Sequence, residues 1–197
     1  MNKGTGTGSG GAAAVLRHAL QEEAARLFRL EEGAPWLALH TRPRSEKQAA
    51  KHCLQLGIRH YLPLRRSEPA KSGQKGQRRY HFEVPLFPGY MFAVCDRQQR
   101  YDLLQTSCLV RTIEVVDQQQ LCDELYNVYL ASNLGVALTL YPLLKRGRWV
   151  RVISGPLAGL SGRISARKDE GFRLVLNVSI LGSAVAVEVD MGAVEAE

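Results

Sequence analysis

The stretch WLALHTRPRSEKQAAKHCLQLGIRHYLPL, residues 36–64, decides the fold because it switches twice between strand and helix patterns. Residues 36–41 and 58–64 are rich in large apolar side chains, which is typical of strands. The residues between them predict a helix that has Ser45 as its N-cap and Gly57 just past its end. The sequence therefore predicts a strand, a helix and a strand at the start of an α+β domain.

The pattern continues toward the C-terminus with further alternation of strands and helices. The stretch EVPLFPGYMFAV, residues 83–94, places prolines and a glycine before a strand that ends near Cys95. Beyond it we expect a short helix over 97–105, a strand over 109–116 and a helix over 118–132. This order predicts an α/β sandwich with a largely antiparallel sheet.

The C-terminal part has a different pattern. Residues 135–144 contain Gly135 and Pro142 and show no clean period, so they are interpreted as a linker. Residues 145–197 predict short strands whose apolar residues alternate, over 148–154, 161–166, 172–180 and 184–190. A segment this short can bury a core only if its strands curl into a small β-barrel. Its alternating valines favour strands over helices as the ground state.

Residues 1–34 precede the first domain. Residues 1–11 are glycine-rich and predict a flexible tail. From Ala12 to Leu30 the apolar positions recur at helical spacing and predict an amphipathic helix, with Leu16, Leu20, Ala24 and Leu27 on its apolar face. Packing on its own domain is the simpler role for this helix, and docking of a partner remains open.

Composition narrows the class of protein. The chain of 197 residues has 45% apolar residues and no apolar run near the roughly 20 residues that cross a bilayer. No secretory signal pattern is present either, so we expect a cytoplasmic, monomeric protein without a membrane. The cysteines are spaced too widely for a zinc knuckle or a redox dithiol, and we expect them to be buried free thiols: Cys53, Cys95, Cys108 and Cys122.

No set of residues points to catalysis, a metal or a cofactor. Paired carboxylates and metal-ligand spacings are absent from the sequence. A hydrolase would need Cys53 oriented by His52 or His60, and nothing in the sequence orients that pair. The sequence therefore predicts a protein that is not an enzyme.

The positive charge is concentrated in one part of the chain. The net charge is +7, and residues 35–118 hold fourteen basic residues against seven acidic ones. Such a local excess is typical of a surface that binds phosphate, although a solvated face gives the same pattern.

Two motifs together resemble the NusG family of transcription elongation factors. Residues 36–64, followed by PLFPGYMF, are similar to the N-terminal NGN domain of that family. KRGRWVRVISGPLAGLSGRI and LNVSILGSAVAVEVDMGAVE are similar to its C-terminal KOW barrel. The resemblance implies an NGN-type α/β sandwich over 35–134, followed after the linker by a small five-stranded KOW β-barrel over 145–197.

The resemblance implies RNA polymerase as the main partner. In the family, a shallow apolar patch of the NGN domain binds the clamp helices of the large polymerase subunit. The matching residues here are Leu86, Phe87, Tyr90 and Phe92. Pro85, Pro88 and Gly89 would make a stiff turn that holds Phe87 and Tyr90 outward, while Phe92 could equally belong to the core.

Basic residues would then lie near the non-template DNA strand of the transcription bubble. Arg42 matches a position that is basic in specialised members of the RfaH-like kind, with His40 and Arg44 beside it. Arg78 and Arg79 lie in the basic segment 65–79, which is expected to be an exposed hairpin tip.

Two further contacts follow from the resemblance in weaker form. Arg100 and Tyr101 stand where specialised members touch the polymerase gate loop, although the family's own residues at that place are lacking. Ile180 and Leu181 lie in the SILG segment, where the family docks a small-subunit ribosomal protein or Rho. The usual aromatic residue of that segment is replaced by Leu181, so the identity of the partner cannot be transferred from the family to this chain.

The resulting hypothesis is an elongation or antitermination factor of the RfaH-like kind. It would bind the polymerase clamp, suppress pausing or termination, and recruit a second partner through the KOW domain. One alternative is a housekeeping elongation or termination factor of the same family. The other is an RNA-binding, ribosome-associated module that uses the basic segment 65–79.

Overall fold

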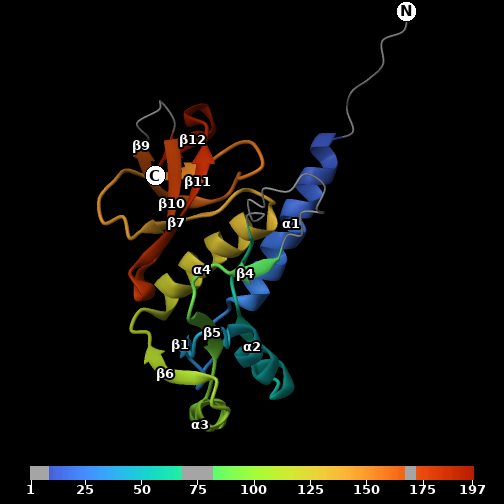
Figure 1. Ribbon diagram of the computed structural model, residues 1–197. Coiled ribbons are helices and arrows are strands. Elements are labelled where there is room, and N and C mark those ends of the chain that lie inside the picture. The colour runs from blue at the N-terminus through green and yellow to red at the C-terminus, as the bar shows by residue number, and fades with distance from the viewer. Residues whose placement is uncertain (1–8, 68–81, 167–171) are drawn as a thin grey trace, which may run out of the picture. The chain divides into compact units, whose positions relative to one another are not determined.

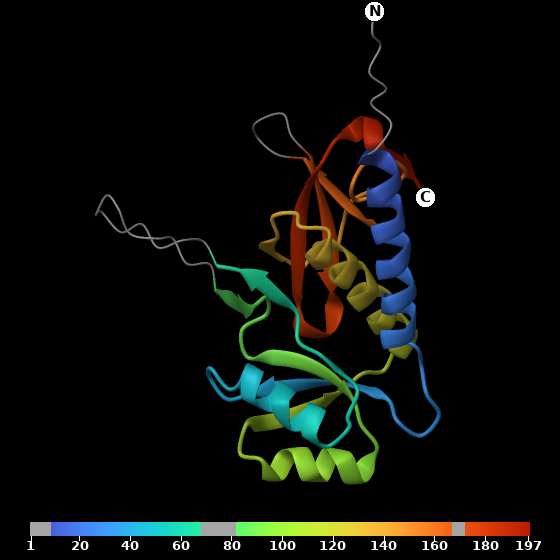
Figure 2. The same ribbon diagram turned by 90° about the vertical axis from the view of Figure 1, so that its right-hand side faces the viewer.

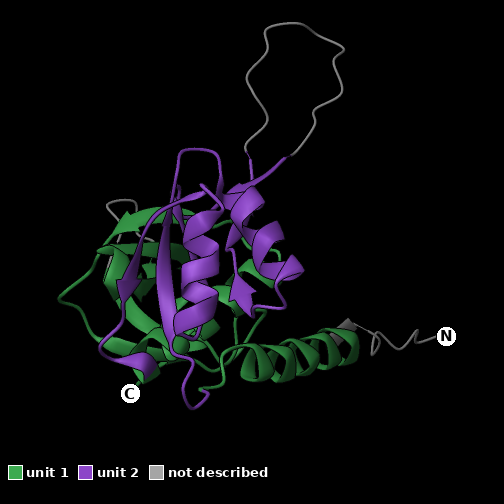
Figure 3. Ribbon diagram, turned by 90° about the horizontal axis from the view of Figure 1, so that it is seen from below, with its two compact units in different colours: residues 1–30, 119–197 green, residues 31–118 purple. Residues whose placement is uncertain are grey.

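The computed structural model describes residues 9–67, 82–166 and 172–197. The chain divides into two compact units, which Figure 3 shows in different colours. Unit 2 consists of residues 31–118, and unit 1 combines residues 1–30 with residues 119–197. The division therefore falls at residue 118 and not in the segment 135–144 that was expected to be a linker. The tail residues 1–8 lie outside the described residues.

Unit 2 is built on a four-stranded antiparallel sheet with the order β2-β5-β1-β6. Its central strands are β1 (Trp36–Thr41) and β5 (Tyr90–Val94), flanked by β2 (His60–Tyr61) and β6 (Leu109–Glu114) (Figure 1). The expected α/β sandwich with an antiparallel sheet is confirmed.

Helices α2 (Glu46–Gln55) and α3 (Arg97–Gln105) cover one face of this sheet (Figure 2). Helix α2 begins after Ser45, which makes no side-chain cap hydrogen bond, and ends before Gly57, whose φ of 64° only glycine adopts readily. Helix α3 is capped by Asp96, whose side chain accepts from the amide of Gln99.

The core beneath these helices follows from the period of two along the strands. Leu37, Leu39, Met91 and Ala93 are buried against Cys53 of α2 and other side chains of the two helices. All four cysteines are buried and free, as expected. Burial raises the pKa of Cys53 and Cys95 to about 12, so neither thiol forms a nucleophilic thiolate at neutral pH.

A short hairpin extends unit 2. Strand β3 (Leu64–Arg66) pairs antiparallel with β4 (Glu83–Pro85). The expected hairpin tip, including Arg78 and Arg79, lies outside the described residues.

Unit 1 contains a six-stranded antiparallel sheet with the order β12-β8-β9-β10-β11-β7. Its strands are β7 (Thr139–Pro142), β8 (Trp149–Val152), β9 (Ser161–Ala166), β10 (Phe172–Val178), β11 (Ser183–Val189) and β12 (Val194–Ala196). One strand more is present than the five expected, because residues 139–142 of the expected linker pair with β11 at the edge of the sheet. Proline is tolerated there, since an edge strand leaves half of its amides unpaired.

The alternation predicted for the C-terminal strands is confirmed. Leu174, Leu176, Val185 and Val187 are buried on one face of the sheet. Ile180 was expected to continue this face, but the strand ends at Val178 and a 3-10 helix, η1 (Ser179–Leu181), follows. Gly162 lies within β9, where an added Cβ would stand 2.8 Å from the carbonyl oxygen of Val175.

Two helices complete unit 1. Helix α1 (Ser9–Leu27) buries Leu20 and Ala24, and Phe28, just beyond its end, contacts the ring of Tyr129 in an edge-to-face manner at 5.9 Å. Leu16 was expected on the buried face, but it is exposed. Tyr129 belongs to α4 (Gln118–Asn133), the helix that was expected within the first domain.

Polar contacts join α4 to the sheet of unit 1. The Oδ1 atom of Asn127 accepts a hydrogen bond from the amide of Ser161 at 3.0 Å. Glu124 accepts the amide of Ser179 at 2.8 Å and so holds η1. These bonds satisfy backbone amides of the sheet unit that the strand ladder does not use.

Candidate nucleic-acid interface

The candidate interface is built around the turn that connects β4 to β5 in unit 2. Gly89 has a φ of 83°, and its backbone is held on both sides. Its amide donates to Oε1 of Glu46 at 2.8 Å, and its carbonyl oxygen accepts from the amide of Thr41 at 2.8 Å. Glu46 is 6% exposed, so this bond links a buried carboxylate to the turn. The turn is therefore stiff, as the prolines predict.

The aromatic residues of the turn differ in exposure. Leu86 and Phe92 are 0% exposed and Phe87 is 3% exposed, so the expectation that Phe87 points outward is wrong. Its burial follows the ordinary preference of a large apolar side chain. Tyr90 is only half-buried, and it is the aromatic residue of the turn that reaches the surface.

Strand register places Tyr90 beside His40, and His40 beside Arg111. Tyr90 pairs with His40 across β5 and β1, and His40 pairs with Arg111 across β1 and β6. Directly paired residues point to the same face of a sheet, so the three side chains form a row, which we call the Tyr90–His40–Arg111 row. The rings of Tyr90 and His40 stack with their centroids 4.9 Å apart and their planes inclined by 16°.

Two arginines lie next to the row on the turn that follows β1. Arg42 and Arg44 are exposed. The amide of Arg42 donates to the carbonyl oxygen of Cys108 at 2.8 Å, and its own carbonyl accepts from Ser45 at 3.0 Å. Arg44 adopts a φ of 63°, which is uncommon for a residue with a Cβ. The backbone of Arg42 is therefore held by hydrogen bonds, and Arg44 follows it on the same turn.

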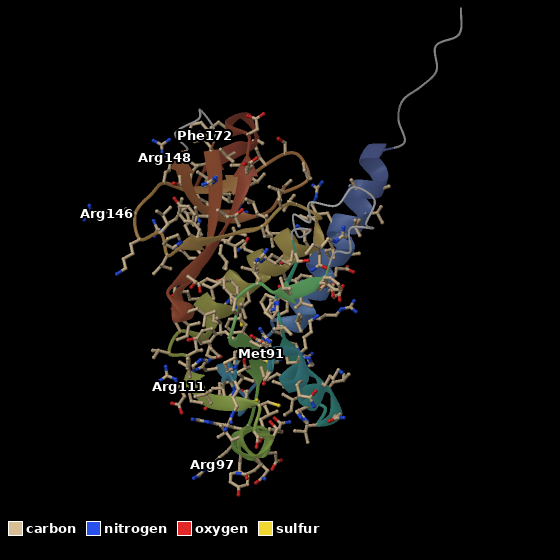
Figure 4. All side chains as sticks on the ribbon, viewed as in Figure 1. Met91, Arg97, Arg111, Arg146, Arg148 and Phe172 are labelled. Atoms are coloured by element: carbon tan, nitrogen blue, oxygen red, sulfur yellow. The ribbon has the colours of Figure 1, made fainter. Side chains whose placement is uncertain are left out.

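Arg111 is the residue that sequence reasoning missed. It is exposed and is labelled in Figure 4 on strand β6. It lies far from residues 40–44 along the sequence, and only the pairing of β1 with β6 brings it beside His40. A strand period alone gives the face of Arg111 but not its neighbour.

The other predicted contacts lie elsewhere. Arg100 of α3 forms an ion pair with Glu114 at 2.7 Å, and the neighbouring Tyr101 is 59% exposed. Ile180 and Leu181 are half-buried in η1 of unit 1, next to the serine that Glu124 holds. The structure thus brings His40, Arg42, Arg44 and Tyr90 together in unit 2, whereas Arg100 and Tyr101 belong to α3 and Ile180 and Leu181 belong to unit 1.

The described residues hold no group of three or more His, Cys, Asp or Glu side chains that could bind a metal ion. Among the same residues, no helix is long and apolar enough to cross a membrane. The interface itself combines the stacked rings of Tyr90 and His40 with the exposed side chains of Arg42, Arg44 and Arg111.

The interface lies in an α/β domain, with an antiparallel sheet, that presents stacked rings and arginines at one end of its strands. Residues 34–122 match the model of the family described as "NusG: Transcription termination factor nusG". The matched segment is a little under half of the chain, and it is similar to this family of transcription factors.

Solved structures show a looser likeness. One described as "Domain interaction in Thermotoga maritima NusG" is 19% identical, covers 82% of this chain and 96% of its own, and has a TM-score of 0.45. Another, described as "Crystal Structure of MjSpt4:Spt5 complex conformation B", is 12% identical, with 82% and 95% coverage and a TM-score of 0.25. No curated protein sequence matches the chain.

Proposed function

We propose that this protein is a non-enzymatic transcription elongation factor that binds RNA polymerase through unit 2. The observation that carries the proposal is the Tyr90–His40–Arg111 row, which lies inside the domain that matches the NusG family. A half-buried aromatic residue such as Tyr90, held on a stiff turn, loses little conformational entropy on binding, and aromatic residues are frequent anchors of interfaces.

Tyr90 takes the place of the wider apolar patch in this proposal. Phe87, Leu86 and Phe92 are buried, so they support Tyr90 from within and do not themselves contact the clamp helices of the large polymerase subunit. A single half-buried ring that reaches the surface, with arginines near it, fits a partner surface that combines apolar and acidic side chains.

The arginines would contact the non-template DNA strand. Arg42, Arg44 and Arg111 are exposed around the stacked rings, and guanidinium groups bind phosphate in a bidentate manner. A splayed base could stack on the half-buried ring of Tyr90. Contacts of this kind favour the elongating state of the polymerase by binding it more tightly than the paused state.

Unit 1 would recruit the second partner. Ile180 and Leu181 are only half-buried, and they are the apolar residues of η1 that a ribosomal protein or Rho could contact. The RfaH-like specialisation and a role in antitermination are part of this proposal, and a housekeeping elongation or termination factor is its alternative. Binding of Rho by the full chain would favour the alternative.

The test is the dwell time of purified RNA polymerase at a pause site in a transcription reaction. We expect the full chain to shorten the dwell time, and the Arg42→Ala, Arg44→Ala, Arg111→Ala triple variant to shorten it less. Lys51→Ala removes an exposed cation from α2, away from the row, and serves as the control that should act like wild type. A wild-type protein that leaves the dwell time unchanged would contradict the proposal.

A further inference from the structure

A second aromatic and basic surface lies in unit 1, on strands β8 and β9. Trp149 pairs with Arg163 across the two strands, so both side chains point to the same face. The neighbouring Val150 and Val152 are buried on the opposite face. Trp149 is 41% exposed, which is unusual for so large an apolar ring in an otherwise well-packed sheet.

Arg163 fixes one side of the Trp149 ring. Its guanidinium carbon lies 5.6 Å from the ring centroid, within the range of a cation–π contact. Its Nη1 also donates to the carbonyl oxygen of Gly147 at 3.0 Å. One face of the indole is thus held by a positive charge, while the exposed part of the ring remains accessible.

The loop before β8, residues 145–148, packs closely against β9. The amide of Ile164 donates to the carbonyl oxygen of Arg148 at 2.9 Å. Gly147 has a φ of 137°, and a Cβ there would stand 3.0 Å from the carbonyl oxygen of Ile164. Lys145, Arg146 and Arg148 are exposed on this loop, and Figure 4 labels the two arginines on the same flank of the sheet.

The charge around Trp149 is positive over a long stretch of the chain. Between Glu124 and Asp169 the sequence has no acidic residue and seven basic ones. Arg151 forms an ion pair with Glu197, and Arg173 lies directly opposite Glu188 on β11. Within residues 9–67, 82–166 and 172–197, no carboxylate pairs with the loop cations Lys145, Arg146 and Arg148.

We propose that Trp149, with Arg163 behind it and the loop cations beside it, is a binding site for single-stranded RNA. An exposed ring backed by a guanidinium stacks an unpaired base, and each exposed cation is available to a backbone phosphate. Bases within a duplex are already stacked and offer their faces to no ring. The choice of RNA over single-stranded DNA rests on the proposed function, in which unit 2 contacts the DNA.

The test is the anisotropy of a labelled single-stranded RNA of about twelve nucleotides, titrated with the full chain in the absence of polymerase. We expect Trp149→Ala to weaken binding by at least about five-fold, since a stacked base contributes roughly 1–3 kcal/mol. The Arg146→Ala, Arg148→Ala double variant should lower the slope of log affinity against log salt by about 1.4, because each single-strand phosphate contact contributes about 0.7.

Intrinsic fluorescence gives a second readout. The chain has two tryptophans, and Trp36 is 1% exposed. Quenching by RNA would therefore report on Trp149, and it should be absent from Trp149→Ala.

Three controls decide the outcome. Lys51→Ala should bind RNA like wild type, because it removes one exposed cation from unit 2. The Arg42→Ala, Arg44→Ala variant should also keep RNA binding, and loss of binding in that variant alone would move the site to unit 2.

Absence of RNA binding by wild type, or equal binding by Trp149→Ala, would overturn the proposal of an RNA site at Trp149. Because unit 2 is itself proposed to contact DNA, the comparison with DNA of the same sequence uses the Arg42→Ala, Arg44→Ala, Arg111→Ala variant, and tighter binding of that DNA than of RNA by this variant would overturn the assignment to RNA. A failure of polymerase binding would leave these results unchanged, so the two proposals fail separately.

Discussion

The two units each present an aromatic residue shortly after a glycine of positive φ, and they hold these turns by opposite charges. In unit 2 the buried carboxylate of Glu46 accepts the amide of Gly89, just before Tyr90. In unit 1 the guanidinium of Arg163 donates to the carbonyl of Gly147, two residues before Trp149. The buried Glu46 stabilises its turn but adds no charge to the surface. Arg163 stabilises its loop and also places a positive charge beside the ring of Trp149.

The two surfaces also differ in the segments that supply their cations. The cations of unit 2 come from separate segments, namely Arg42 and Arg44 after β1 and Arg111 on β6. Those of unit 1 are Lys145, Arg146 and Arg148 on the loop before β8, with Arg163 on the neighbouring strand β9. We therefore expect the first surface to depend on the integrity of the sheet and the second on one loop.

The largest expected effect separates Phe87 from Tyr90. Phe87→Ala should lower the free energy of unfolding by about 3–5 kcal/mol, since a buried aromatic side chain leaves a cavity. Tyr90→Ala should lower it by no more than about 1 kcal/mol, because that ring is only half-buried. Urea unfolding of both variants measures this, and equal losses would show that both rings belong to the core.

The next effect concerns the buried carboxylate. Glu46→Ala should cost about 1–3 kcal/mol of unfolding free energy, since the amide of Gly89 loses its acceptor. Glu46→Gln keeps an acceptor oxygen at the same place and should cost less. Thermal or urea unfolding distinguishes the two variants. If both behaved like wild type, the carboxylate would not hold the turn.

The two glycines give a smaller contrast. Gly89→Ala should lower the free energy of unfolding by about 1–2 kcal/mol, the usual penalty of a left-handed conformation for a residue with a Cβ. No steric clash adds to this penalty, because the atoms nearest to the new Cβ are ring atoms of His40 at 3.8 Å and 3.9 Å. Gly147→Ala should cost more, since its Cβ would also crowd the carbonyl oxygen of Ile164. Unfolding of the two variants under one condition tests the order, and the reverse order would contradict this account of the loop.

The smallest effect is expected at the ion pair of Arg100 with Glu114. The pair is on the surface, so Arg100→Ala should change the free energy of unfolding by no more than about 1 kcal/mol. High salt should remove most of that difference. A larger, salt-independent loss would mean that Arg100 supports packing rather than charge.

Much of the fold could be predicted from residues whose local chemistry is unambiguous. Gly57 ends α2, and the alternation of Leu174 and Leu176 marks β10, because backbone conformation and burial leave few other choices. Strand β7 was missed because Pro142 reads as a linker residue and an edge strand needs no regular pattern.

The candidate site was predictable only in part. The sequence indicates a stiff turn at Gly89, but it does not say which of its rings is covered, and Phe87 proved to be buried. Arg111 joins His40 only through strand register, which depends on pairing between distant segments. Tertiary pairing, and not local pattern, therefore decides which predicted residues act together.

The most direct test of the central claim is the affinity of the full chain for purified RNA polymerase, measured by co-purification and then by titration. We expect wild type to bind, Tyr90→Ala to bind at least about ten-fold more weakly, as an interface anchor would, and Leu54→Ala, a change at an exposed apolar residue of α2, to bind like wild type. A wild-type chain that does not bind polymerase, or a Tyr90→Ala variant that binds it equally well, would contradict the account.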